Sequence, residues 1–182
     1  MKLEEKQLSH KLVYECFFMK LYEDDVLLPD NKKSKRIYIM HNSAAAVLPI
    51  TKDGKIVLVN QYRYPIRSES LEIPAGKKDF LNEDGKECAM RELEEETGYI
   101  SEKVEHMVDI NSCVGYSNEK IEIFIARDCV KAENPKQSDD DEFLEIKEYT
   151  KAEAHDLMTS GKIQDAKTLI ALQRYLMEHH NV

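Results

Sequence analysis

The part of this sequence that most limits its fold is one helical stretch lying between segments typical of strands. Across residues 84–97 the apolar side chains recur at helical spacing, and Gly98 follows where a glycine commonly ends a helix. The side chains expected on the buried side of this helix are Ala89, Met90, Leu93 and Thr97.

Extended segments surround this helix on both sides. The turn Lys52-Asp53-Gly54 separates two apolar runs, at 44–50 and 55–60, as in a β-hairpin. Further strands are expected at 69–74, 104–112, 119–126 and 143–149, and further helices at 151–160 and 165–179. Because strands and helices do not alternate regularly, the sequence predicts an α/β (α+β) fold in which helices cover a mixed sheet.

Residues 1–42 form a separate predicted region. Loose alternation with aromatic side chains over 11–28 leads to the turn signal Pro29-Asp30-Asn31, and residues 35–40 then read as a second strand. We therefore expect a small antiparallel β unit at 1–42 and a larger domain at 43–182. A unit this small does not bury enough apolar surface to fold by itself.

Composition excludes some classes of partner. The net charge of −9 argues against a general binder of nucleic acid or of anionic membranes, since either needs a basic face. No run of about 18 apolar residues appears, and the N-terminus lacks the pattern of a signal peptide. The four cysteines lie far apart and predict neither a zinc site nor a disulfide framework. We expect a soluble, cytoplasmic protein.

The residues that point to chemistry lie on the helix at 84–97. Glu92, Glu95 and Glu96 are spaced i, i+3, i+4 and share one face, which lies beside the apolar face. Arg91 is placed to pair with Glu95, which would leave Glu92 and Glu96 pointing outward with uncompensated charge. Hard divalent cations bind such clusters of oxygen atoms. The alternative is a solvated acidic helix face.

The surroundings of this cluster resemble the Nudix box. The matching residues are Gly76, Glu83, Arg91, Glu92, Leu93, Glu95, Glu96 and Gly98. Two positions depart from the pattern. Six residues separate Gly76 from Glu83 where the family has five, and Tyr99 stands where an aliphatic residue is usual.

Over nearly the whole chain the sequence resembles the ADP-ribose pyrophosphatase branch of the Nudix hydrolases. The segments that carry the resemblance are at 59–65, 71–76, 140–145 and 160–168. Within 112–117, Val114 replaces the proline of the Ser-Pro-Gly motif that is usual in the branch. The resemblance implies a Nudix α/β/α sandwich with a mixed sheet, together with the small N-terminal β unit.

The resemblance also implies a metal site that holds Mg²⁺ or Mn²⁺. Its ligands would be the backbone carbonyl of Ala75 and the carboxylates of Glu92 and Glu96, with help from Glu95. Arg91 would orient these carboxylates. Asp79, in the loop after Gly76, is a weaker candidate for a metal ligand or a base.

For the substrate, the resemblance implies that Arg63 and Arg36 bind phosphate and that Phe18 stacks on the base. Arg36 could equally be an ordinary surface charge, and Phe18 could simply pack in the core. Glu72, in the matched segment at 71–76, and Gly115, which follows Val114 in the segment at 112–117, complete the substrate-binding candidates.

The implied reaction is hydrolysis of the pyrophosphate bond of ADP-ribose or a similar nucleoside-diphosphate sugar. With ADP-ribose the products would be AMP and ribose 5-phosphate. In the acidic loop at 139–142, Glu142 is the expected base for the attacking water, Asp141 is its neighbouring alternative and Glu95 is the next candidate.

Other readings stay open at this point. The substrate could be GDP-mannose or another nucleotide sugar, and the protein could be a non-catalytic sensor that binds ADP-ribose. An isomerase on the same fold is a third option. The resemblance further implies a homodimer in which the N-terminal unit swaps across and completes the partner's site.

Overall fold

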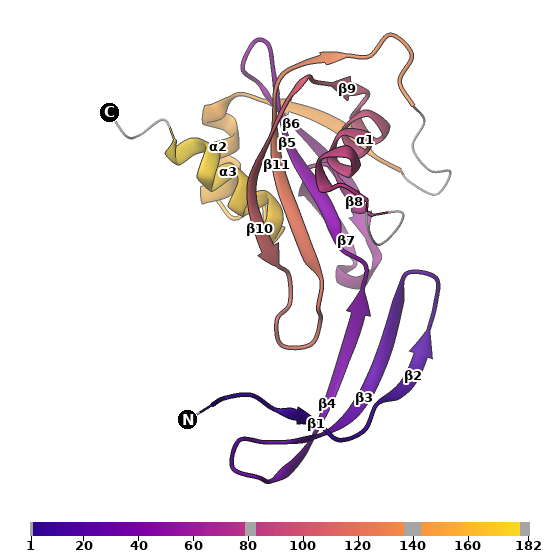
Figure 1. The fold of residues 1–182 in the computed structure, drawn as a ribbon. Coiled ribbons are helices and arrows are strands. Elements are labelled where there is room, and N and C mark those ends of the chain that lie inside the picture. Colours follow the sequence, from indigo (N-terminus) through magenta and orange to yellow (C-terminus); the bar gives the residue numbers. More distant parts are fainter. Residues whose placement is uncertain (1, 79–82, 137–142, 179–182) are drawn as a thin grey trace. The chain divides into compact units, whose positions relative to one another are not determined.

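A computed structural model describes residues 2–78, 83–136 and 143–178 and is drawn in Figure 1. The chain forms two compact units. The first contains Met1–Ser43 and Asn111–Lys120, and the second contains Ala44–Ile110 and Ile121–Val182. The first unit therefore includes Asn111–Lys120, a segment that the sequence pattern assigns to the larger domain. Within the described ranges, no helix is both long enough and apolar enough to cross a membrane.

The first unit is an antiparallel sheet built around strand β3. Its strands are β1 (Lys6–Gln7), β2 (Lys11–Glu15), β3 (Met19–Leu27) and β4 (Lys33–His41). Strand β4 pairs along all of β3, from Met19↔His41 to Leu27↔Lys33, while β1 and β2 pair with the two ends of the other edge. Asn31 adopts a positive φ of 65° in the predicted turn between β3 and β4.

The segment Asn111–Lys120 is hydrogen-bonded to β4 within this unit. The Ile39 amide donates to the Tyr116 carbonyl at 2.7 Å, and the His41 amide donates to Asn118 Oδ1 at 2.7 Å. These bonds explain why the segment belongs to the first unit although it lies far from β4 in the sequence.

The second unit contains a mixed sheet. Its strands are β5 (Ala44–Thr51), β6 (Ile56–Arg63), β7 (Ser68–Glu72), β8 (Ala75–Lys77), β9 (Tyr99–Ile100), β10 (Lys103–Asn111), β11 (Lys120–Lys131) and β12 (Glu145–Tyr149), with a 3₁₀ turn at Tyr64–Ile66. The strand order is β10-β11-β5-β6-β12, and β7, β8 and β9 pair with β6, β5 and β11 respectively. Strands β5 and β11 are parallel, whereas β6 is antiparallel to β7 and β12.

Helices cover both faces of this sheet. They are α1 (Gly85–Thr97), α2 (Lys151–Thr159) and α3 (Ala166–Met177). Successive β5 side chains point to opposite faces: Leu48 joins an apolar cluster with Leu172 of α3, and Val47 joins a second cluster with Leu93 of α1. Figure 1 shows α1 on one side of the sheet and α2 with α3 on the other. The predicted α/β/α layering is confirmed.

Several local expectations need correction. Strands β8 and β9 were not expected from the pattern, and the strand predicted at 143–149 begins at Glu145. Met90 is 39% exposed, so its predicted burial is wrong. The buried side of α1 instead includes Cys88, Ala89 and Leu93 together with Glu92 and Glu96.

Candidate active site

The helix that carries the glutamate cluster has well-defined ends. At its start, Asp84 Oδ1 accepts hydrogen bonds from the backbone amides of Lys86 and Glu87, at 2.8 and 3.2 Å. At its end, Gly98 adopts a left-handed φ of 67° and its amide donates to the Glu94 carbonyl. These two caps fix where α1 begins and ends.

Arg91 holds several groups of the predicted box in place. Its Nη1 donates to Glu92 Oε1 at 2.7 Å and to Glu95 Oε2 at 3.1 Å, and its Nη2 donates to the Lys77 carbonyl of β8 at 3.1 Å. Its Nε lies 3.5 Å from Glu83 Oε1. The structure thus places Arg91 where it orients two box carboxylates and ties them to β8.

The environment of Glu92 and Glu96 differs from the prediction. Their exposed fractions are only 7% and 5%, so they do not point outward, and Glu92 is paired with Arg91. The helical spacing identifies their common face, but it gives no information on β8, which pairs with β5 beside that face.

Strand β8 and α1 come into direct contact at these carboxylates. The Ala75 amide donates to Glu96 Oε2 at 3.2 Å. A Cβ atom on Gly76 would overlap with the Glu92 carboxylate, so any other residue at this position would force that carboxylate to move. The structure therefore brings the predicted ligand residues Ala75, Glu92, Glu95 and Glu96 together around β8 and Arg91.

These groups suit a hard divalent cation because they offer carboxylate and carbonyl oxygen atoms. Among the described residues, which leave out 79–82 and 137–142, no three His, Cys, Asp or Glu side chains form a ready-made metal cluster. In this arrangement the Arg91 guanidinium pairs with both Glu92 and Glu95, so its single positive charge offsets only part of their negative charge.

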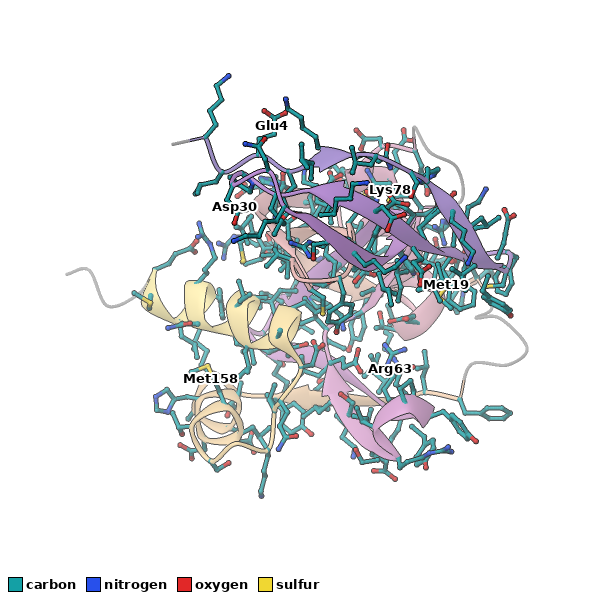
Figure 2. All side chains as sticks on the ribbon, turned by 90° about the horizontal axis from the view of Figure 1, so that it is seen from below. Glu4, Met19, Asp30, Arg63, Lys78 and Met158 are labelled. Atoms are coloured by element: carbon teal, nitrogen blue, oxygen red, sulfur yellow. The ribbon has the colours of Figure 1, made fainter. Side chains whose placement is uncertain are left out.

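A second charged group lies at the ends of β6 and β7. Glu72 Oε1 accepts from Arg63 Nε at 2.8 Å, and Glu72 Oε2 accepts from Arg63 Nη2 at 2.7 Å and from Lys167 Nζ at 2.5 Å. Burial alone would raise the pKa of Glu72, but the bonds from Arg63 and the charge of Lys167 lower it to about 2. Arg63, labelled in Figure 2, remains 42% exposed at its side chain.

Glu72 and Arg63, two of the predicted substrate-binding residues, therefore lie in contact but differ in exposure. Glu72 is buried and its two oxygen atoms are used by Arg63 and Lys167, so it is placed to hold Arg63. Lys167 is absent from the sequence-based candidates. A single lysine near a helix start carries no local signal, and its partner lies 95 positions away.

Three other candidates lie in the first unit. Arg36 forms a two-pronged ion pair with Glu5 through Nε and Nη2. Phe18 is half-buried, with its ring edge-on to Phe17 and His41 at centroid distances of 5.0 and 6.1 Å. Gly115 has open space where a side chain would extend. The candidate bases Glu142 and Asp141, and also Asp79, lie outside the described residues.

The departure from the box at Tyr99 has a structural reason. Its ring is buried, its hydroxyl donates to Glu148 of β12, and Lys131 Nζ lies 3.9 Å from the ring centre. A tyrosine can replace an aliphatic residue here because its polar end finds a partner. The other unusual residue, Val114, is 82% exposed and does not pack in the core.

Comparisons with known proteins agree with this architecture. The NUDIX domain family matches residues 40–173. A protein of Bacillus methanolicus described as a methanol dehydrogenase activator is 41% identical over 170 residues, covering 93% of this chain and 91% of its own length. The ADP-ribose pyrophosphatase of Bacillus subtilis (strain 168) is 39% identical over 171 residues, covering 94% and 92%.

A solved structure described as an ADP compounds hydrolase has the same fold. It superposes with a TM-score of 0.86 at 21% identity and covers 100% of both chains. Nudix proteins generally use a divalent metal, in keeping with the oxygen-rich surroundings of β8 and α1. The resemblance to the Nudix box is confirmed, and the chain belongs to the NUDIX domain family.

Proposed function

We propose that this protein hydrolyses the pyrophosphate bond of ADP-ribose, or of a similar nucleoside-diphosphate sugar, to a nucleoside monophosphate and a sugar phosphate. The observation that carries this proposal is the placement of Glu92 and Glu96 against β8, with Arg91 bridging Glu92 and Glu95. The similarity to the Bacillus subtilis ADP-ribose pyrophosphatase over 94% of this chain supports the choice of substrate.

The cation would be held by Glu92, Glu96 and the Ala75 carbonyl, with Glu95 beside them. When bound, Mg²⁺ or Mn²⁺ neutralises the anionic pyrophosphate and lowers the pKa of a water molecule. Arg91 keeps the carboxylates oriented through its bonds to Glu92 and Glu95.

Arg63 is the proposed phosphate ligand. Glu72 occupies the Nε and Nη2 edge of the guanidinium, and Nη1 forms no hydrogen bond with the described residues. A partly exposed guanidinium held along one edge can offer its remaining donors to a phosphate oxygen.

For the base, we retain Glu142, with Asp141 and then Glu95 as alternatives. We expect Glu142→Gln to lower the maximal rate by about ten- to a thousandfold, the scale of a lost general base, with little change in the affinity for substrate or Mg²⁺. Steady-state kinetics on Asp141→Asn and Glu142→Gln compare the two directly. If Asp141→Asn is crippling while Glu142→Gln is mild, the base is Asp141. If every single substitution in the loop at 139–142 is mild, Glu95 becomes the candidate.

Product analysis in Mg²⁺ tests the proposed substrate. ADP-ribose, GDP-mannose, UDP-glucose and a diadenosine polyphosphate are compared at equal concentration, and phosphorylated products are separated and identified. We expect ADP-ribose to give AMP and ribose 5-phosphate at the highest kcat/KM. If GDP-mannose is hydrolysed at a higher kcat/KM, it replaces ADP-ribose as the proposed substrate. If the protein binds ADP-ribose but hydrolyses none of the compounds, it is a non-catalytic sensor that binds ADP-ribose.

We also propose that the protein is a homodimer formed through its first unit. Apolar side chains of this unit are exposed, including Val13 at 52%, Phe17 at 93% and Ile37 at 61%. Light scattering of the full chain should give the mass of two copies. Deleting residues 1–42 should abolish both the dimer and the activity, and a deletion variant that stays dimeric and active contradicts the swap.

A further inference from the structure

Four charged side chains from three elements, one of them Arg63, form a chain of contacts. Arg63 ends β6, Glu72 ends β7, and Lys167 and Asp165 lie at the start of α3. Lys167 Nζ contacts Glu72 Oε2 at 2.5 Å and lies 3.1 Å from Asp165 Oδ1. The order of charges along this chain of contacts is therefore positive, negative, positive, negative.

The start of α3 also holds Ile73, the residue that follows Glu72. Asp165 caps the helix by accepting from the Thr168 amide at 3.0 Å and from Thr168 Oγ1 at 2.6 Å. Thr168 Oγ1 in turn accepts from the Ile73 amide at 2.8 Å. Consecutive residues, Glu72 and Ile73, are thus held by consecutive residues of α3, directly ahead of Ala75.

The burial of Lys167 needs a functional or structural reason. A lysine is rarely buried unless it is paired, and Lys167 is only 8% exposed. Lys167 does not contact Arg63 itself. The Glu72 carboxylate lies between the two cations and accepts a hydrogen bond from each. Asp165 pairs with Lys167 and balances its charge, while Glu72 covers only the Nε and Nη2 edge of Arg63. Lys167 therefore acts on Arg63 by holding the Glu72 carboxylate in place.

We propose that Lys167 is a positioning residue for the substrate phosphate, acting through Glu72 on Arg63. It fixes the Glu72 carboxylate, so that Glu72 holds the Nε and Nη2 edge of the guanidinium and leaves Nη1 directed to the phosphate. This role rests on the proposed function, because Arg63 is the phosphate ligand in that proposal.

The kinetic test compares Lys167→Met with Lys162→Met, which removes the same charge from an exposed position in the same segment. Lys167→Met should raise KM for ADP-ribose about tenfold, the scale of one weakened charged hydrogen bond, and change kcat by less than about threefold. Lys162→Met should change neither by more than about threefold.

The role through Arg63 is tested in a second background. In Arg63→Met, adding Lys167→Met should leave KM unchanged, because the group it positions is already gone. A further tenfold rise in KM in that background overturns the proposal, as does an unchanged KM for Lys167→Met alone.

A second readout does not depend on activity. The Nε–H proton of Arg63, identified in NMR spectra by its loss in Arg63→Met, should exchange with water at least about tenfold faster in Lys167→Met than in the wild type. Faster exchange with no cleavage of any nucleotide sugar means that the positioning holds and the proposed function fails. If the wild type cleaves ADP-ribose but Lys167→Met changes neither the exchange rate nor KM, the proposed function holds and the positioning role fails.

Lys167→Arg covers the case in which Lys167→Met does not fold. This variant keeps the positive charge next to Glu72, so KM and the Arg63 Nε–H exchange should stay within about threefold of the wild type. A loss of affinity by about tenfold or more despite the retained charge contradicts the proposal.

Discussion

The two units of this protein fill their interiors in opposite ways. In the first unit, Asp24 and Val26 are the buried residues among those that the structure describes. In the second unit, two apolar clusters lie on the two faces of β5, one containing Leu48 and Leu172 and the other containing Val47 and Leu93. One interior is thus centred on a carboxylate and the other on aliphatic side chains.

The buried carboxylate of the first unit is well supplied with donors. Asp24 accepts from Gln7 at 2.6 Å, from Tyr38 at 2.8 Å and from the Lys11 amide at 3.3 Å, and His10 Nδ1 lies 3.1 Å away. Burial would raise the pKa of Asp24, but these hydrogen bonds lower it to about 2.

The difference between the two interiors separates what selects one strand register from what stabilises the folded state. Hydrogen bonds to Asp24 are directional and join β1, β2 and β4 to β3, so they favour one register of the sheet. A typical hydrogen bond contributes only about 1 kcal/mol net, whereas burying one large aliphatic side chain contributes about 1.5–3 kcal/mol. The first unit is therefore well specified but weakly stabilised, and the second unit provides the rigid frame that the glutamates need.

The largest expected effect is on catalysis and lies in the second unit. Glu96→Gln should lower kcat at least about a hundredfold while the fold stays intact, because a carboxylate of the proposed metal site is lost. The matched control is Glu94→Gln on the same helix, which should stay within about threefold of the wild type. The measurements are kcat for ADP-ribose and the circular dichroism spectrum. A Glu96→Gln enzyme with near-normal turnover removes the metal assignment.

The next effect compares the two interiors directly. Leu48→Ala should destabilise the second unit by about 3 kcal/mol, because it leaves a cavity in a packed core. Val26→Ala should destabilise the first unit by about 1.5 kcal/mol, the value for two buried methyl groups. Urea unfolding gives the totals, and amide hydrogen exchange on β3 and β5 assigns each loss to its unit. Equal losses in the two units contradict the comparison.

The smallest effect is confined to acid pH in the first unit. Because the pKa of Asp24 in the folded protein is about 2, below its ordinary 3.8, the ionised carboxylate stabilises the folded state above about pH 4. This stabilisation is lost as the pH falls through the folded pKa towards 2. Asp24→Asn should therefore flatten the pH dependence of the amide protection factors in β3, measured relative to the unfolded chain, between about pH 4 and 2. If the wild type shows no such dependence, the Asp24 network does not stabilise the unit.

Sequence alone determined the features whose signals are local. Gly98 marks the end of α1, and the turn at Lys52-Asp53-Gly54 marks the β5–β6 hairpin, in which Gly54 adopts a φ of 81°. The spacing of Glu92, Glu95 and Glu96 puts them on one helical face, and the box around them indicates the family. Helical period, turn geometry and motif spacing depend on neighbouring residues, so one chain suffices to recognise them.

Only the tertiary structure decided what each face meets. Met90 has the right spacing for burial and is exposed, while Glu92 and Glu96 are buried against β8. Lys167 contacts Glu72 across 95 positions of sequence, and no local pattern announces that bond. Periodicity tells which residues share a side, but the partner of that side depends on sheet order and on contacts between distant segments.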